Sequence, residues 1–140
     1  MGENKKVDTG QKTNDVGHKT KIQSFTDLEA WRSAHALYVS IYSATKVFPK
    51  DEMFGITSQI RRASLSVSSN IAEGFGRSPR SADRVHFYTM ARGSLTEVQN
   101  QLFAGRDVEL LTRDTFEELY NKSIVTHKLL NGLINATKGS

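Results

Sequence analysis

Apolar residues recur every three or four positions along most of the chain, and this spacing constrains the fold more than any other feature. The clearest run covers residues 88–105. Its members are Tyr88, Ala91, Leu95, Val98, Leu102 and Gly105. Such spacing places side chains on one face of an α-helix. Three further runs have the same period, and no β-hairpin signal competes with them. The sequence therefore predicts an all-α protein with four helices.

The first predicted helix lies between a starting signal and a proline. Thr26 and Glu29 have the spacing of a capping box, which satisfies two backbone donors at a helix start. Pro49 ends the helix, because proline lacks the backbone N–H that a helix interior needs. The apolar face predicted between them consists of Leu28, Trp31, His35, Tyr38, Ile41 or Tyr42, Thr45 and Phe48.

The second predicted helix starts near Asp51, and two glycines follow its apolar run. Gly74 and Gly76 stand where a left-handed C-terminal cap is expected. Ser78 then predicts the N-cap of the third helix, with Pro79 at its first position. The fourth helix is predicted to start around Thr112 to Thr115, where there is a further capping box. It consists of Thr115 and Glu118.

These elements predict one domain, an antiparallel up-down-up-down four-helix bundle over residues 25–140. Residues 1–24 are polar and rich in lysine, threonine, asparagine and glycine, which predicts a disordered tail. The chain has no cysteine, which suits a cytoplasmic protein and excludes thiolate metal sites. No apolar run approaches the roughly 20 residues of a membrane span, so we expect no membrane association.

Positive charge is concentrated in residues 53–92, where six arginines oppose only Glu73 and Asp83. The arginines are Arg61, Arg62, Arg77, Arg80, Arg84 and Arg92. The guanidinium group suits recognition of phosphate and of buried carboxylate better than lysine does. A basic zone of this kind fits either nucleic-acid binding or salt bridges between subunits.

A row of small and charged residues lies beside the apolar face of the second helix. It consists of Arg62, Ser66, Ser69, Glu73 and Arg77, spaced to share one helix face. Small side chains would let another backbone approach closely, although a solvated face explains the row equally simply. The sequence EGFGRSP that follows lacks the glycine spacing of a phosphate-binding loop and no strand precedes it.

Several motifs in this region resemble one protein family. They are Phe48-Pro49, Gln59, Arg61-Arg62-Ala63, Ser69-Asn70-Ile71-Ala72-Glu73-Gly74, Arg77, Ala91-Arg92-Gly93-Ser94, Glu97 and Gln101. In this order they resemble the four-helix-bundle proteins encoded in intervening sequences of bacterial 23S ribosomal RNA genes, over roughly residues 25–135. The segment FAGRDV at 103–108 departs from the family, which usually has a more apolar helix end there.

The resemblance implies an antiparallel bundle that assembles as a homopentameric ring. In such a ring the subunit contacts would fall on Ser66, Ser69, Asn70, Glu73, Gly93 and Ser94. A mid-helix glycine costs about 1 kcal/mol relative to alanine, which suggests a packing reason for Gly93. A related branch of the family, the accessory variability proteins of diversity-generating retroelements, binds a reverse transcriptase and nucleic acid.

No catalytic, metal or cofactor site can be assembled from the sequence. The chain lacks the Glu-x-x-His units of a di-iron bundle and three converging zinc ligands. His18 lies in the tail, and His35 and His127 fall on predicted apolar faces. The prediction is a non-enzymatic homo-oligomer that binds RNA or DNA through the six arginines. Phe75, Phe87 and Tyr88 lie nearby and could stack on unpaired bases or belong to the core. The alternative is a protein-interaction scaffold that docks a reverse transcriptase.

Overall fold

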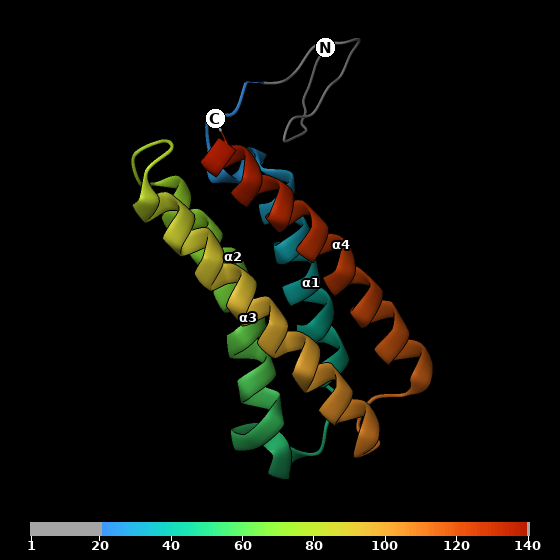
Figure 1. The fold of residues 1–140 in the computed structure, drawn as a ribbon. Helices are drawn as coiled ribbons and strands as arrows, with labels where there is room; N and C mark the ends of the chain where they lie inside the picture. Colours follow the sequence, from blue (N-terminus) through green and yellow to red (C-terminus); the bar gives the residue numbers. More distant parts are fainter. Residues whose placement is uncertain (1–20, 140) are drawn as a thin grey trace, which may run out of the picture.

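The structure, a computed structural model, describes residues 21–139, and its regular elements in this range are all helical (Figure 1). The long helices are α1 (Glu29–Thr45), α2 (Ser58–Phe75), α3 (Ala82–Asp107) and α4 (Arg113–Gly139). The predicted all-α class with four helices is confirmed. Residues 1–20, which hold most of the predicted tail and His18, lie outside the described part. Within that part, no helix has the length and apolar content needed to cross a membrane.

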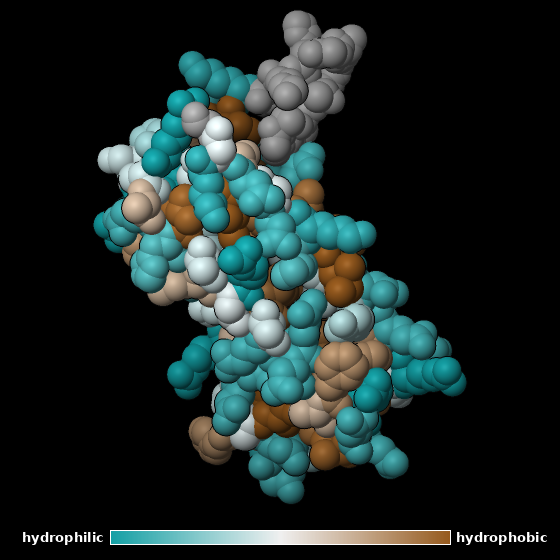
Figure 2. Space-filling model, in the orientation of Figure 1, coloured by the Kyte–Doolittle hydropathy of each residue, from teal (hydrophilic) through white to brown (hydrophobic). Residues whose placement is uncertain are grey.

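The core lies where the helices face one another. α2 packs on α3, α3 packs on α4, and α1 contacts both α2 and α4. The apolar face predicted for residues 88–105 is buried along its whole length. Tyr88 is the largest of the side chains that are completely buried. On the face drawn in Figure 2, hydrophilic residues cover most of the surface and apolar side chains emerge between them in separate patches. Burial of the shared apolar faces is what holds the helices together.

The apolar face of α1 agrees with the prediction at Leu28, Ile41 and Thr45 and differs from it between Leu28 and Ile41. Its buried residues are Ala30, Ala34, Leu37, Ile41 and Thr45. The predicted members His35 and Tyr38 are respectively exposed and half-buried. The prediction followed the large aromatic side chains, whereas close packing against α2 and α4 selected the smaller residues beside them.

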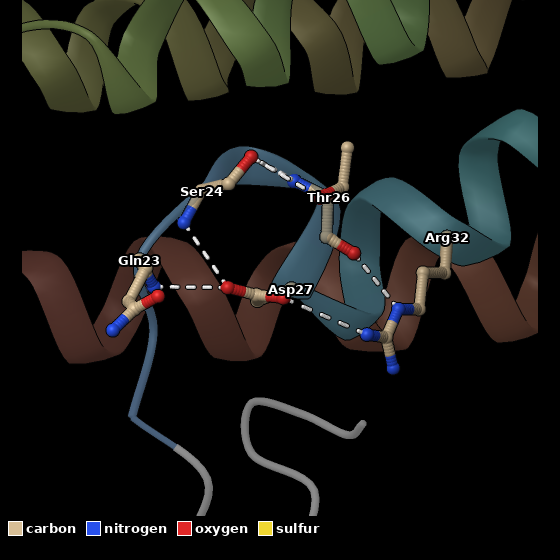
Figure 3. A network of polar contacts seen from close by, with 5 residues as sticks. All are labelled: Gln23, Ser24, Thr26, Asp27 and Arg32. Carbon is tan, nitrogen blue, oxygen red and sulfur yellow. Dashed lines mark hydrogen bonds and ion pairs between the residues drawn. The ribbon is translucent and has the colours of Figure 1, made fainter. Parts of the chain in front are cut away.

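The chain enters α1 through a short 3-10 turn, η1 (Phe25–Asp27), that Ser24 caps (Figure 3). The Ser24 N–H donates to Asp27 Oδ2 at 3.1 Å, and the Thr26 N–H donates to Ser24 Oγ at 3.2 Å. Arg32 then ties this turn to α1 by donating to the Thr26 carbonyl at 2.8 Å. The capping box predicted for Thr26 and Glu29 is therefore wrong, because the cap forms before the turn rather than inside it. Ile22 already packs against the core at this end.

The connection from α1 to α2 contains two short helical turns, η2 (Lys50–Glu52) and the π-helical η3 (Met53–Thr57). The backbone of Gly55 is non-helical, with φ −110° and ψ −119°. Regular α2 therefore begins at Ser58, later than the start predicted near Asp51. Phe54 in this connection is 93% exposed.

The two glycines near the end of α2 do not form the predicted left-handed cap. Gly74 lies inside α2 and is buried, and Gly76 ends the helix with a right-handed φ of −75°. The reason for Gly74 is close approach of α3. A Cβ atom at this position would lie 2.8 Å from Cε1 of Tyr88.

The N-caps of α3 and α4 also differ from the prediction. Ser81, not Ser78, caps α3 by accepting a hydrogen bond from the Arg84 N–H at 3.0 Å. Arg80 precedes it in the left-handed region, with φ 61°. At α4, Thr112 accepts from the Thr115 N–H at 3.1 Å, so the cap forms one turn before the predicted pair. Hydroxyl residues stand at several nearby positions, and the turn geometry decides which one reaches the helix start.

Candidate nucleic-acid interface

Arg77 is held in a small cluster at the α2–α3 connection. Its Nη2 lies 2.9 Å from Glu73 Oε2, one turn earlier in α2, and its Nη1 lies 3.6 Å from Asp83 Oδ2 in α3. The guanidinium also lies over the ring of Phe87, 4.6 Å from its centroid. Two carboxylates therefore neutralise the charge of Arg77, which pins the start of α3 to the end of α2.

Arg84 caps the C-terminal end of α2 from the first turn of α3. Its guanidinium donates to the carbonyl oxygens of Phe75 and Arg77, the latter at 2.8 Å from Nη2. It also lies over the ring of Phe75, 4.9 Å from the centroid. Carbonyl groups at the end of a helix lack partners within the helix and carry partial negative charge. Arg84 donates hydrogen bonds to two such carbonyl groups and forms no ion pair with a carboxylate among the described residues.

Arg61 and Arg92 connect neighbouring helices. Arg61 in α2 donates from Nε to Thr45 Oγ1 of α1 at 2.8 Å, and its guanidinium lies 3.9 Å from the centroid of the Tyr42 ring. Arg92 in α3 donates to Oδ1 of Asn131 in α4 at 2.9 Å. Both hydrogen-bond partners are neutral, so neither offsets the positive charge of its arginine.

The remaining two arginines are exposed. Arg62 and Arg80 form no ion pair with any described residue. The helix rise of 1.5 Å per residue places Arg62 about 20 Å from the end of α2, beyond which Arg80 lies. The six predicted arginines therefore extend along the length of the molecule and do not gather in one compact patch.

The arginines outside this segment are engaged differently. Arg32, Arg106 and Arg113 each lie within ion-pair distance of an acid in the same chain. The short contact between Arg106 and Asp107 raises the pKa of Arg106 and lowers the pKa of Asp107. Acids outnumber arginines around the α3–α4 connection. The acidic residues are Asp107, Glu109, Asp114, Glu117 and Glu118. The α3–α4 connection therefore carries a local excess of negative charge.

Three of the predicted subunit-contact residues lie between α2 and α3 of the same chain. The hydroxyls of Ser66 and Ser94 are 3.0 Å apart, and the Asn70 side-chain amide donates to the Ser66 carbonyl at 2.9 Å. All three side chains are half-buried. They therefore already have partners within the monomer, and their predicted role between subunits stays a prediction.

The other predicted subunit-contact residues face outward. Ser69, Glu73 and Gly93 are exposed. A Cβ atom on Gly93 would meet nothing within 4 Å, so nothing among the described residues explains a glycine in the middle of α3. The packing reason expected for Gly93 is absent from the described part of the chain.

The histidines of the described residues, His35, His86 and His127, gather in no metal site. His35 stacks on Trp31 with the ring centroids 4.8 Å apart, and His127 lies beside the Asn131 amide. Between residues 21 and 139, no three histidine or acidic side chains gather closely enough to hold a metal ion. The absence of catalytic function stays a prediction.

Of the aromatic residues predicted as stacking candidates, Tyr88 is completely buried and belongs to the core. Phe75 and Phe87 are half-buried beneath Arg84 and Arg77. An exposed aromatic ring beside a predicted arginine is Tyr42, which the sequence analysis gave as an alternative to Ile41 on the apolar face of the first helix. Its spacing of four from Tyr38 was the available signal.

Comparisons with known proteins agree on one family. The model of the 23S rRNA-intervening sequence protein family matches residues 26–132. Among solved structures, a protein of unknown function from the S23 ribosomal protein family of Bacteroides thetaiotaomicron is similar, with 25% sequence identity and a TM-score of 0.66. The match covers 75% of this chain and 97% of that protein. A search of curated proteins finds no match.

Proposed function

Because this chain belongs to the 23S rRNA-intervening sequence protein family, we propose that it is a non-enzymatic, cytoplasmic, homo-oligomeric helical bundle that binds RNA or DNA. The contact is with the phosphate backbone, which arginine recognises through its planar fork of donors. Binding of this kind is independent of sequence and weakens steeply as salt is added.

The observation that carries the proposal is a difference between two groups of arginines in how many have an acidic partner. Five of the six arginines in residues 53–92 pair with no carboxylate among the described residues, the exception being Arg77. By contrast, Arg32, Arg106 and Arg113 all have an acid within 4 Å. Ordinary surface arginines in this protein are thus ion-paired, whereas those of the segment keep their charge for an external anion.

Assembly is the second part of the proposal. The helices form an antiparallel up-down-up-down bundle, and five copies close into a ring through two different faces of each subunit. The short connections between consecutive helices support the antiparallel order. Two exposed features support assembly: Gly93 has open space where a side chain would stand, and Phe54 is 93% exposed.

The nucleic-acid test compares charge-matched variants. Affinity for a structured RNA and for a DNA of the same sequence is measured across a salt series with the full chain. Arg62→Gln combined with Arg80→Asn removes two exposed charges, and asparagine tolerates the left-handed backbone of Arg80. Arg106→Gln combined with Arg113→Gln removes the same charge at the acidic α3–α4 end.

We expect micromolar or tighter binding by the wild type, with a steep dependence on salt. The Arg62/Arg80 variant should bind more weakly, with a salt slope smaller by about one per lost phosphate contact. The Arg106/Arg113 variant should bind like the wild type. Absence of binding to both nucleic acids at low salt would overturn the proposal and direct attention to a protein partner such as a reverse transcriptase.

The assembly test is the mass in solution. Light scattering coupled to gel filtration at micromolar concentration should give about five times the chain mass of 15.6 kDa. A mass of one chain at that concentration would rule out the ring.

A further inference from the structure

Two tyrosines form an exposed aromatic surface on the outer side of α1. The ring centroids of Tyr38 and Tyr42 lie 6.0 Å apart, with 56° between the ring planes. Tyr42 is 41% exposed and Tyr38 is half-buried. A hollow of about 470 Å³ adjoins them and is lined by these rings together with Val39, Ser43 and Lys46.

Two cations lie over the Tyr42 ring. The Arg61 guanidinium of α2 lies 3.9 Å from the centroid of Tyr42, and Lys46 Nζ lies 5.9 Å from it. Arg61 is held in place by Thr45 Oγ1, which itself donates to the Ile41 carbonyl at 2.9 Å. The position of the guanidinium over the ring is therefore set by the packing of α1 on α2.

The hollow beside the tyrosines lacks acidic side chains among the described residues, whereas Glu118 lines a neighbouring hollow that shares Val39 and Ser43 with it. Neither Arg61 nor Lys46 pairs with a carboxylate in the described chain. Arg62, the next residue in α2, is also exposed, and it pairs with no acid in the same range. An exposed aromatic surface with unneutralised cations lying against it matches a ligand that has flat, apolar faces and carries negative charge.

We propose that Tyr38, Tyr42, Arg61 and Lys46 bind an unpaired stretch of nucleic acid. An unstacked base packs on the tyrosine rings or on the Arg61 guanidinium plane, while Lys46 and Arg61 contact the flanking phosphates. This inference rests on the proposed nucleic-acid function and narrows it to single strands. A base inside a duplex has both faces covered by its neighbours, so it cannot use the tyrosines, whereas every unpaired base offers a free face.

The test uses the full chain and three fluorescein-labelled probes: a 12-nucleotide oligo(U), the matching oligo(dT), and a 12-base-pair duplex. Fluorescence anisotropy gives the affinity for each probe. Tyr38→Leu combined with Tyr42→Leu removes the aromatic faces and keeps apolar bulk. Phe103→Leu is the matched control, since Phe103 is 37% exposed and also lies beneath an arginine, Arg106, at 5.0 Å.

We expect the Tyr38/Tyr42 variant to bind both single strands about five- to a hundred-fold more weakly, as loss of base stacking predicts, with duplex affinity unchanged. Phe103→Leu should leave all three affinities unchanged. Tyr42→Phe should retain single-strand binding, because a phenyl ring keeps the stacking face. Comparison of the affinities for oligo(U) and oligo(dT) shows whether the site prefers RNA or DNA.

Photocrosslinking shows directly which residues lie beside the bound base. An oligonucleotide with one 5-iodouracil, irradiated in complex with the wild type, should crosslink to Tyr38 or Tyr42 in peptides identified by mass spectrometry. Crosslinks confined to another element, or unchanged single-strand affinity of the Tyr38/Tyr42 variant, would overturn this site while leaving nucleic-acid binding intact. Failure of the wild type to bind any probe would overturn the proposed function as well.

Discussion

The ring of Tyr88 in α3 lies so close to Gly74 in α2 that the glycine position has no room for a side chain. A Cβ atom there would lie 2.8 Å from Cε1 and 2.9 Å from Cδ1 of Tyr88. Both residues are buried, and the tyrosine ring is rigid and surrounded by the core. The contact sets how closely α2 and α3 approach near the connection that carries Arg77 and Arg80.

We expect Gly74→Ala to destabilise the protein, because overpacking a buried contact costs about 1–3 kcal/mol. The matched control is Gly132→Ala in α4, where a new Cβ atom meets nothing within 4 Å and only the gain in helix propensity applies. The free energy of unfolding, measured by urea titration, should be lower for Gly74→Ala than for Gly132→Ala by at least that amount. Equal stabilities would show that α3 can move away from α2 easily.

Tyr88→Phe should leave the protein as stable at neutral pH or stabilise it by up to about 1 kcal/mol. The Tyr88 hydroxyl is buried and has no hydrogen-bond partner among the described residues, so its removal costs no native interaction. Urea titration at pH 7 measures the change. A loss of more than about 1 kcal/mol would indicate that the hydroxyl has a partner, such as a buried water.

The same residue predicts a dependence on alkaline pH. Burial raises the pKa of Tyr88, an effect that the nearby charge of Arg84 only partly opposes. The folded state therefore keeps the phenol proton above pH 10, where the unfolded chain loses it. The Tyr88 contribution to stability is complete below pH 10 and decreases as the pH rises toward the pKa of the folded state. Unfolding free energies measured at pH 8 and at about pH 11 should fall more in the wild type than in Tyr88→Phe. A parallel decline in the two proteins would contradict this assignment.

Replacement of Arg84 should loosen the end of α2. Arg84→Ala removes hydrogen bonds to the carbonyls of Phe75 and Arg77, and we expect a loss of about 1–3 kcal/mol, since hydrogen bonds to charged groups contribute this much. Arg84→Lys should recover only part of that loss, because an ammonium group lacks the planar fork that reaches two carbonyls. Urea titration gives the stability, and amide hydrogen exchange over residues 72–80 should locate the change. Full recovery of stability by Arg84→Lys would show that a positive charge alone is enough to stabilise the end of α2.

Gly93 and Gly132 provide a paired test of assembly. Both are exposed helical glycines with open space where a Cβ atom would stand in the monomer, so alanine should favour the helix by about 1 kcal/mol at each. If Gly93 lies at a close contact between subunits, as proposed, Gly93→Ala should shift the light-scattering mass toward smaller species, whereas Gly132→Ala should not. An unchanged mass for both variants would place the subunit contact elsewhere.

The helical fold was predicted correctly from the sequence, whereas some of the residues that form its core were not. Leu95, Val98 and Leu102 are buried as predicted, because a strictly periodic apolar face leaves one way to place a helix against its neighbours. On α1 only the middle of the predicted face was wrong. There His35 and Tyr38 were predicted to face the core, and the close fit against two helices placed Ala34 and Leu37 inside instead.

Periodicity and composition therefore established four helices, the core of α3 and an arginine-rich middle segment. These properties depend on residues near one another in the sequence, where local spacing is sufficient information. Which arginines remain free for a ligand depended on contacts between distant positions. Arg61 meets Thr45 sixteen residues away, and Arg92 meets Asn131 thirty-nine residues away. The pairing of Tyr42 with Arg61 has the same origin, because packing of one helix on another brings together side chains whose separation along the chain carries no signal.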